Sequence, residues 1–292
     1  MNALRARLNV LWWVGRQTLI WTNVFAIDAV LVAISWQQLL SLVMRDRLAT
    51  LAESAALSLA VWVVYTGDHL LDGFRVKPDR FSSRRHRWHH DHARMMTWLT
   101  IIAGLASATV SLVFLSRDIV AAGLVLASLV LAYGLAVHAP MNKRVPTIQV
   151  WKEPLVGLGY AFGVGLCPLT ESANAKSVGT ILLFAALCTS NCLVVAFAER
   201  DQDRQHGFHS VPLRYPSLIK PLRWGLVALG LGSLVGCYVA VRPDLFLIAV
   251  AISAGTLWLA ERYLRHDEEL VTLADLALIL GALGGIIGWT RA

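Results

Sequence analysis

Long apolar stretches recur along the whole chain, and this recurrence is the strongest constraint on its fold. Nine can be delimited, at 18–43, 50–67, 95–115, 118–138, 151–170, 178–198, 221–241, 243–261 and 270–290. Each approaches the roughly 20 residues that a helix needs to cross a bilayer core. The chain is 57% hydrophobic and 15% charged, whereas soluble domains average about 45–50% and about 25%. The sequence therefore predicts an all-α polytopic membrane protein: a nine-transmembrane-helix bundle around a central apolar cavity, forming one domain over residues 1–292.

Basic residues are divided unevenly between the two sides that nine spans define. Most of the 26 Lys and Arg residues fall on the side of the N-terminus, and the exceptions are Arg45, Arg47, Arg117, Lys176, Arg242 and Arg291. The positive-inside rule makes the N-terminal side cytoplasmic, as in a protein of the bacterial inner membrane. Residues 1–16 are expected to form a short interfacial helix. The net charge of +7 then reflects topology and contact with anionic membrane lipids, and it requires no nucleic acid.

Two acidic pairs stand at the ends of apolar stretches on this predicted cytoplasmic side. Asp68/Asp72 and Glu199/Asp203 each have i,i+4 spacing, which places both carboxylates on one helix face. Ionisable groups at membrane depth are costly and usually functional. Mg²⁺ prefers oxygen ligands and commonly joins carboxylates to a phosphate. The pairs therefore predict a metal site, with Asp201 as a fifth acid, that holds a phosphate group against an apolar chamber. The polar segments 68–94 and 199–220 are expected to form cytoplasmic cap loops over it.

The surroundings of these pairs resemble the motifs of the UbiA superfamily of intramembrane prenyltransferases. The family's first motif is N-D-x-x-D-x-x-x-D, and its last two acids correspond to Asp68 and Asp72. The second motif is D-x-x-x-D followed by Gly and Ser; it corresponds to Glu199, Asp203, Gly207 and Ser210. Between them, the run Pro140, Met141, Asn142, Lys143 and Arg144 is similar to the family's Y-P-x-x-K-R turn. The chain departs from the family at four positions, which are Val64 and Tyr65 in place of Asn and Asp, Glu199 in place of Asp, and Ala139 in place of Tyr.

This resemblance implies Mg²⁺-dependent transfer of a prenyl group from an isoprenyl diphosphate to a lipophilic, apolar or aromatic acceptor. The implied metal ligands are Asp68, Asp72, Glu199, Asp203 and Asp201. The basic residues expected to bind the diphosphate are Arg75, Lys77, Lys143, Arg144, Arg200 and Arg204. Tyr65 is expected to face the allylic cation, because aromatic faces stabilise cations. Asn23, Asp28 and Asn191 lie within spans and are expected to face the cavity or the acceptor.

Three other functions remain open at this point. A membrane terpene cyclase of the same superfamily would use the same fold without an acceptor. A non-catalytic lipid-binding protein would keep the acids only as partners of the many arginines. The third alternative comes from His86, His89, His90 and His92, whose H-x-x-H-H spacing is similar to the iron-binding boxes of membrane oxidases. This histidine segment can instead be a basic surface helix, or it can help to grip the diphosphate.

Overall fold

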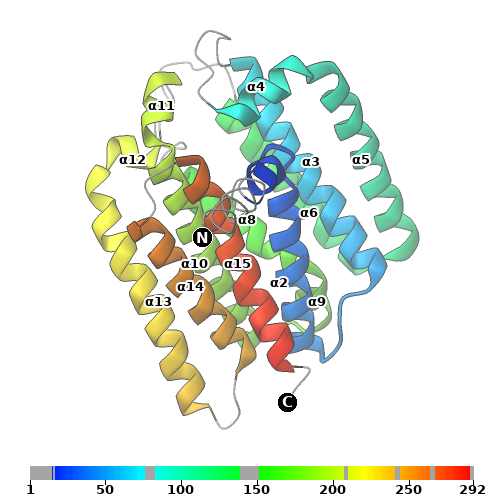
Figure 1. The fold of residues 1–292 in the computed structure, drawn as a ribbon. Coiled ribbons are helices and arrows are strands. Elements are labelled where there is room, and N and C mark those ends of the chain that lie inside the picture. Colours follow the sequence, from blue (N-terminus) through cyan, green and yellow to red (C-terminus); the bar gives the residue numbers. More distant parts are fainter. Residues whose placement is uncertain are drawn as a thin grey trace, which may run out of the picture.

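The structure is a computed structural model, and it describes residue 15 and residues 17–75, 83–138, 151–206, 210–240, 244–263 and 267–289. The described residues form an all-α bundle (Figure 1). Its helices are α2 (Ile27–Arg45), α3 (Leu51–Arg75), α4 (Arg84–Asp91), α5 (Ala93–Phe114), α6 (Arg117–His138), α8 (Lys152–Val164), α9 (Leu166–Glu171), α10 (Ala175–Ala198), α11 (Arg200–His206), α12 (Val211–Arg214), the 3-10 turn η2 (Pro216–Leu218), α13 (Ile219–Val239), α14 (Leu245–Tyr263) and α15 (Asp267–Trp289).

Eight helices in the described part of the chain are long and apolar enough to cross a membrane. They correspond to eight of the nine predicted spans, so the class of fold, an all-α polytopic bundle, is confirmed. The remaining stretch, 151–170, is divided at Gly165 into α8 and α9, and each of these helices alone is too short to cross a membrane. The backbone N–H of Gly165 still donates to Ala161 and its carbonyl accepts from Leu169, so the two pieces continue one another along the bundle.

The first predicted span, 18–43, is also interrupted. Residues 17–24 are helical, but Ala26 has a left-handed backbone (φ 54°), and α2 begins at Ile27. The side chain of Asn23 donates to Asp28 across this break, at 2.8 Å. The apolar stretch predicted a continuous helix here, whereas the structure has a break that is bridged by a polar contact.

One buried core runs through α2, α8, α10, α14 and α15. At its centre Trp36 is stacked on Phe184 with ring centroids 4.4 Å apart, and its indole N–H donates to the carbonyl of Leu278. Gly157 lets α8 approach α10, because a Cβ at this position would lie 2.6 Å from the backbone nitrogen of Thr189. In the last span, Gly281 likewise lets α15 approach α14, because a Cβ at this position would collide with Ser253 and Ala249.

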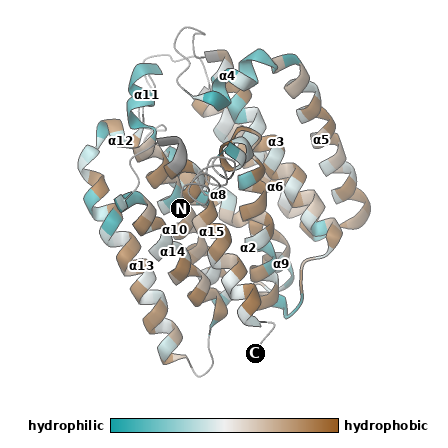
Figure 2. Ribbon diagram, viewed as in Figure 1, coloured by the Kyte–Doolittle hydropathy of each residue, from teal (hydrophilic) through white to brown (hydrophobic). Residues whose placement is uncertain are grey.

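The two ends of the bundle differ. At one end lie the short polar helices α4 and α11, which stand out as hydrophilic in Figure 2. The predicted cap loops are therefore wrong in part: residues 68–75 continue α3, and residues 84–91 and 200–206 are helical. The polar composition of these segments suggested loops, but a helix at the end of a bundle can be equally polar, and the i,i+4 spacing of the acids is that of a helix. The interfacial helix expected at 1–16 lies outside the described residues, apart from position 15.

At the other end, ion pairs join α2, α3 and α9. Arg45 binds Glu53 with two nitrogens, at 2.7 and 3.1 Å, and it also binds Glu171 at 2.9 Å. Arg47 binds Glu171 at 2.8 Å. Because the side chains of Arg45 and Glu53 are almost fully buried, these pairs fix three helices to one another at this end.

Candidate functional site

The two acidic pairs lie at the same end of the bundle, on different helices. Asp68 and Asp72 are in the last turns of α3, and Tyr65 precedes them on the same face. Glu199 follows the last residue of α10, and the backbone N–H of Asp203 donates to its carbonyl at 2.9 Å. The helical hydrogen bonding thus continues from α10 into α11, so that both members of the second pair share a face.

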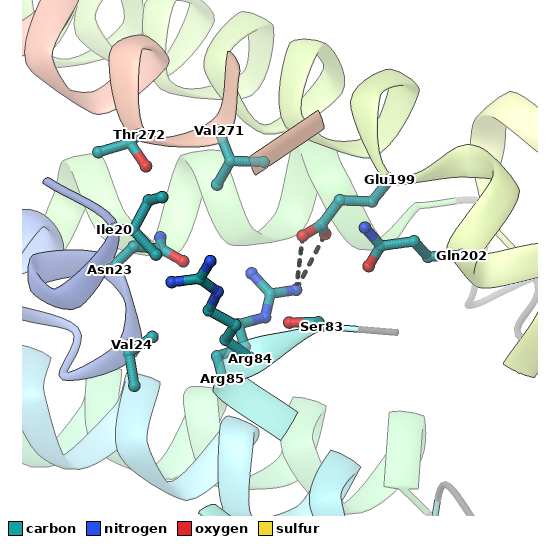
Figure 3. Close-up of a pocket in the computed structure, with 10 residues that line it drawn as sticks. All are labelled: Ile20, Asn23, Val24, Ser83, Arg84, Arg85, Glu199, Gln202, Val271 and Thr272. Carbon is teal, nitrogen blue, oxygen red and sulfur yellow. Dashed lines mark hydrogen bonds and ion pairs between the residues drawn. The ribbon is translucent and has the colours of Figure 1, made fainter. Parts of the chain in front are cut away.

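Arg85, at the start of α4, stands between the two pairs. Its guanidinium forms an ion pair with Glu199 at 2.9 Å (Figure 3). It also interacts electrostatically with Asp72 and Asp68. Burial opposes the positive charge, but the carboxylates more than offset this effect, so the pKa of Arg85 is raised above its usual value. Arg85 therefore carries a permanent positive charge that both acidic pairs share.

Lys152, the first residue of α8, is a second shared cation. Its charge interacts with Asp68, Asp72 and Glu153, and also with Asp203. The sequence analysis does not identify Lys152, because no pattern in the sequence shows that α8 begins beside the end of α3. Arg85 was missed in the same way, as one basic residue among many.

Four carboxylates thus interact with the same two basic side chains of the described residues, Arg85 and Lys152. Burial raises the pKa of Asp203, and the nearby carboxylate of Glu199 adds to the effect. Carboxylates gathered in a partly buried position offer oxygen atoms that can bind a cation.

A polar pocket opens beside this cluster (Figure 3). It lies between the segment 17–24, the start of α4, the junction of α10 with α11, and α15. The residues that line it are Ile20, Asn23, Val24, Ser83, Arg84, Arg85, Glu199, Gln202, Val271 and Thr272. Two arginines and several neutral hydrogen-bond donors make this pocket suitable for the oxygens of an anionic head group.

The histidine segment forms α4, and the structure places its side chains differently from the surface interpretation. His86 and His89 are buried, and the ring of His89 packs against that of His69 on α3 with centroids 5.1 Å apart. Burial and the charge of Arg85 lower the pKa of His86 to about 3. The surface helix is therefore wrong for these two residues, which pack α4 onto α3 as neutral rings.

Several residues predicted for the site lie elsewhere. Asp201 and Arg204 are exposed on α11 and bind each other at 3.4 Å, so the structure does not bring them to the acidic cluster. Arg200 is half-buried beside it, with an Nε that has no hydrogen-bond partner among the described residues. Three positions, Lys77, Lys143 and Arg144, lie outside the described residues, as does the side chain of Arg75.

Deeper in the bundle, the residues predicted to face the cavity or acceptor do come together. Asn23 donates to Asp28, and Asn191 on α10 donates to Asp275 on α15, each at 2.8 Å. Tyr65 interacts electrostatically with both aspartates and packs edge-to-face on Tyr160 at 6.2 Å. Asp275 was missed from the sequence, although an acid inside the apolar stretch 270–290 is the same signal that identified Asp28.

The acidic cluster fits Mg²⁺ by the chemistry of its donors. All four acids offer the oxygen ligands that this ion prefers. The carboxylates are not gathered at ligand distance, however: among the described residues no three or more His, Cys, Asp or Glu side chains form a group that could hold a metal ion. Arg85 holds the carboxylate of Glu199 in an ion pair, so this pair would have to open before Glu199 could bind a metal ion.

Fold and site together define a multi-pass membrane protein with an acidic, arginine-bridged cluster at one end of an apolar bundle. Comparison with family models, curated proteins and solved structures finds no match to this chain.

Proposed function

We propose that this protein binds a prenyl diphosphate with the help of Mg²⁺ and transfers the prenyl group to a lipophilic acceptor. The observation that carries the proposal is the cluster of four carboxylates from two helices around Arg85 and Lys152, at the mouth of an apolar bundle. A diphosphate on a long apolar tail needs both parts: a charged end that neutralises it and an apolar interior that takes the tail.

Asp68, Asp72, Glu199 and Asp203 are the residues that would hold Mg²⁺. When bound, the ion would neutralise phosphate oxygens and stabilise the departing diphosphate. Arg85 is the residue that exchanges partners. It binds Glu199 in the described structure, and it would turn to the diphosphate once the metal takes over the carboxylates. Lys152 and the pocket residue Arg84 supply further positive charge there.

The residues below the cluster suit the prenyl group. Tyr65 lies one turn from Asp68 on the same face of α3, and its ring meets that of Tyr160. Aromatic faces at this depth attract an allylic cation, the more so where water is excluded. The two rings would therefore hold the cation close to where it forms.

The polar side chains of the interior favour transfer over cyclisation. A cyclase that quenches its cation internally is served by an apolar chamber. Asn23, Asp28, Asn191 and Asp275 instead place hydrogen-bonding groups near Tyr65, where an acceptor with a polar group would meet the cation. We infer from the distribution of basic residues that the acidic end faces the cytoplasm, consistent with a bacterial inner-membrane protein.

The test is to incubate purified protein with geranyl or farnesyl diphosphate, with and without Mg²⁺ and phenolic acceptors. Release of diphosphate and the mass of the products are measured. We expect Mg²⁺-dependent release that Asp68→Asn and Asp203→Asn abolish, whereas Asp118→Asn, at the exposed start of α6, leaves it unchanged. A cyclic hydrocarbon formed without acceptor would identify the protein as a cyclase, and binding without release would identify a lipid-binding protein.

A further inference from the structure

Four polar side chains form a continuous chain of polar contacts inside the bundle. Asn23 donates to one carboxylate oxygen of Asp28, and the backbone N–H of Ala29 donates to the other, both at 2.8 Å. The carboxyl groups of Asp28 and Asp275 lie close enough to interact directly with each other. Asn191 donates to Asp275 at 2.8 Å. The chain thus joins α2, α15 and α10 through a pair of acids, here called the Asp28–Asp275 dyad.

A hydrogen bond between two carboxyl groups requires a proton between them, because an ionised carboxylate can only accept. Two carboxylates in contact cannot both be ionised at low cost, and the first proton is therefore held tightly. Among the described residues, the titratable neighbours of the pair are Tyr65, Tyr160, Cys188 and Cys192, and the one cation that acts on it is Arg85. The dyad therefore carries one proton and one negative charge, and it can accept a second proton.

Asn191 provides an independent indication that a ligand belongs here. The residue is only 9% exposed, and its side-chain amide donates to Asp275 of the dyad. Its carbonyl oxygen Oδ1 is buried and has no hydrogen-bond partner among the described residues. Leaving a buried acceptor unpaired destabilises the folded protein, and a ligand O–H would satisfy it. The ligand group that suits both Oδ1 and the dyad is thus a hydrogen-bond donor.

The dyad is also connected to the polar pocket. Asn23, which binds Asp28, lines that pocket, and so does Thr272, one turn before Asp275 on α15. The dyad therefore lies beside residues that line the pocket at the acidic end of the bundle.

We propose that the Asp28–Asp275 dyad, with Asn191, is the binding site for a hydroxyl-bearing acceptor and accepts the proton that this hydroxyl loses on prenylation. This inference rests on the proposed function. The bond between the prenyl carbon and the diphosphate oxygen breaks, and its electron pair leaves with the diphosphate. The acceptor supplies the electron pair of the new bond to the prenyl carbon. The electrons of its O–H bond remain in the acceptor when the proton leaves. The proton passes to the dyad, which then holds two protons and no charge.

The first experiment tests the shared proton without any substrate. Infrared spectroscopy of the purified protein at neutral pH should show the carbonyl band of a protonated carboxylic acid. The double variant Asp28→Asn/Asp275→Asn should lose it, and the control Asp118→Asn should keep it. A parent protein without this band overturns the proposal, because no proton is then shared.

The second experiment separates proton removal from ionisation of the diphosphate. Farnesyl diphosphate and the probe 1-naphthol are supplied, and released diphosphate and prenylated naphthol are measured separately. In Asp275→Asn, whose amide can still donate to Asp28, diphosphate release should persist while prenylated naphthol falls about a hundredfold or more, the usual contribution of a positioned base. Asn191→Ala should raise the KM for naphthol and leave that for the diphosphate unchanged; it also serves as the test if Asp275→Asn does not fold. In the parent protein, 1-methylnaphthalene, which lacks the hydroxyl, should not be prenylated.

The outcomes are distinguishable. If the parent protein releases no diphosphate, the proposed function fails, and the acceptor site fails with it. If it releases diphosphate, but Asp275→Asn prenylates naphthol as the parent does and Asn191→Ala leaves both KM values unchanged, the proposed function stands. The dyad is then only a structural link between helices.

Discussion

Replacement of Arg85 tests whether its guanidinium holds the two acidic pairs together. In Arg85→Gln the cluster keeps its four carboxylates but loses one of the two cations that they share among the described residues, while Lys152 remains. Loss of one partner from a buried ion pair costs about 3–5 kcal/mol. The side chains of Arg85 and Glu199 keep 17% and 16% of their surface exposed, so solvent screening reduces this to about 2–3 kcal/mol. The variant should therefore unfold at a lower temperature in the presence of a chelator.

A divalent cation should reverse this loss, because it replaces the missing charge. Ligand binding stabilises the folded state by about 2.7 kcal/mol at a concentration 100 times Kd, which is enough to restore Arg85→Gln. The assay is thermal unfolding in detergent micelles, followed by tryptophan fluorescence, with chelator or with Mg²⁺. We expect a larger Mg²⁺ stabilisation in Arg85→Gln than in the parent protein, and no such difference in the control Arg117→Gln. Equal stability of the parent and the variant, or stabilities that do not respond to Mg²⁺, would refute the reasoning.

Three further predictions concern stability. The pKa of His86 is lowered to about 3 in the folded state from about 6.5 in the unfolded chain. Between these values only the unfolded chain binds the proton, so folded stability falls as the pH drops from about 6.5 towards 3; in His86→Gln, denaturant midpoints measured across this range should fall less steeply. Glu53→Gln removes the partner of buried Arg45 and should cost about 3 kcal/mol in a denaturant titration while leaving diphosphate release intact. Gly157→Ala places a Cβ against α10 and should lower the melting temperature by an amount equivalent to about 1–3 kcal/mol. The control Gly179→Ala, where a Cβ meets nothing within 4 Å, should leave the melting temperature unchanged. Equal effects of the two substitutions would contradict the close packing of α8 on α10.

The sequence predicts the class of fold well, because whether a segment of about 20 residues is apolar enough to span a membrane depends on those residues alone. Eight of the predicted spans are long apolar helices in the described structure. The break at Ala26 and the division at Gly165 escaped prediction. Both depend on packing and on polar contacts such as that between Asn23 and Asp28, which a count of apolar residues does not contain.

The candidate site is predictable only in part. The i,i+4 spacing finds Asp68 with Asp72 and Glu199 with Asp203, since it depends on one helix at a time. Which cation stands between the pairs depends on where α4 and α8 lie in space, and many basic residues compete for that place. Asp201 shows that proximity in sequence can also mislead: it is two residues from Asp203, but its side chain pairs with Arg204 and does not join the cluster.

The ion pairs of Arg45 and Arg47 with Glu53 and Glu171 stabilise one end of the bundle. They tie α2, α3 and α9 together at the end opposite the polar pocket and the acidic cluster. Under the proposed function these pairs would hold the helices together at the end away from the chemistry, so that reactants would enter and products would leave by the acidic end or sideways into the lipid. The chemistry of protons and charged phosphates would then stay on one side of the membrane, and the ion gradients across it would be preserved.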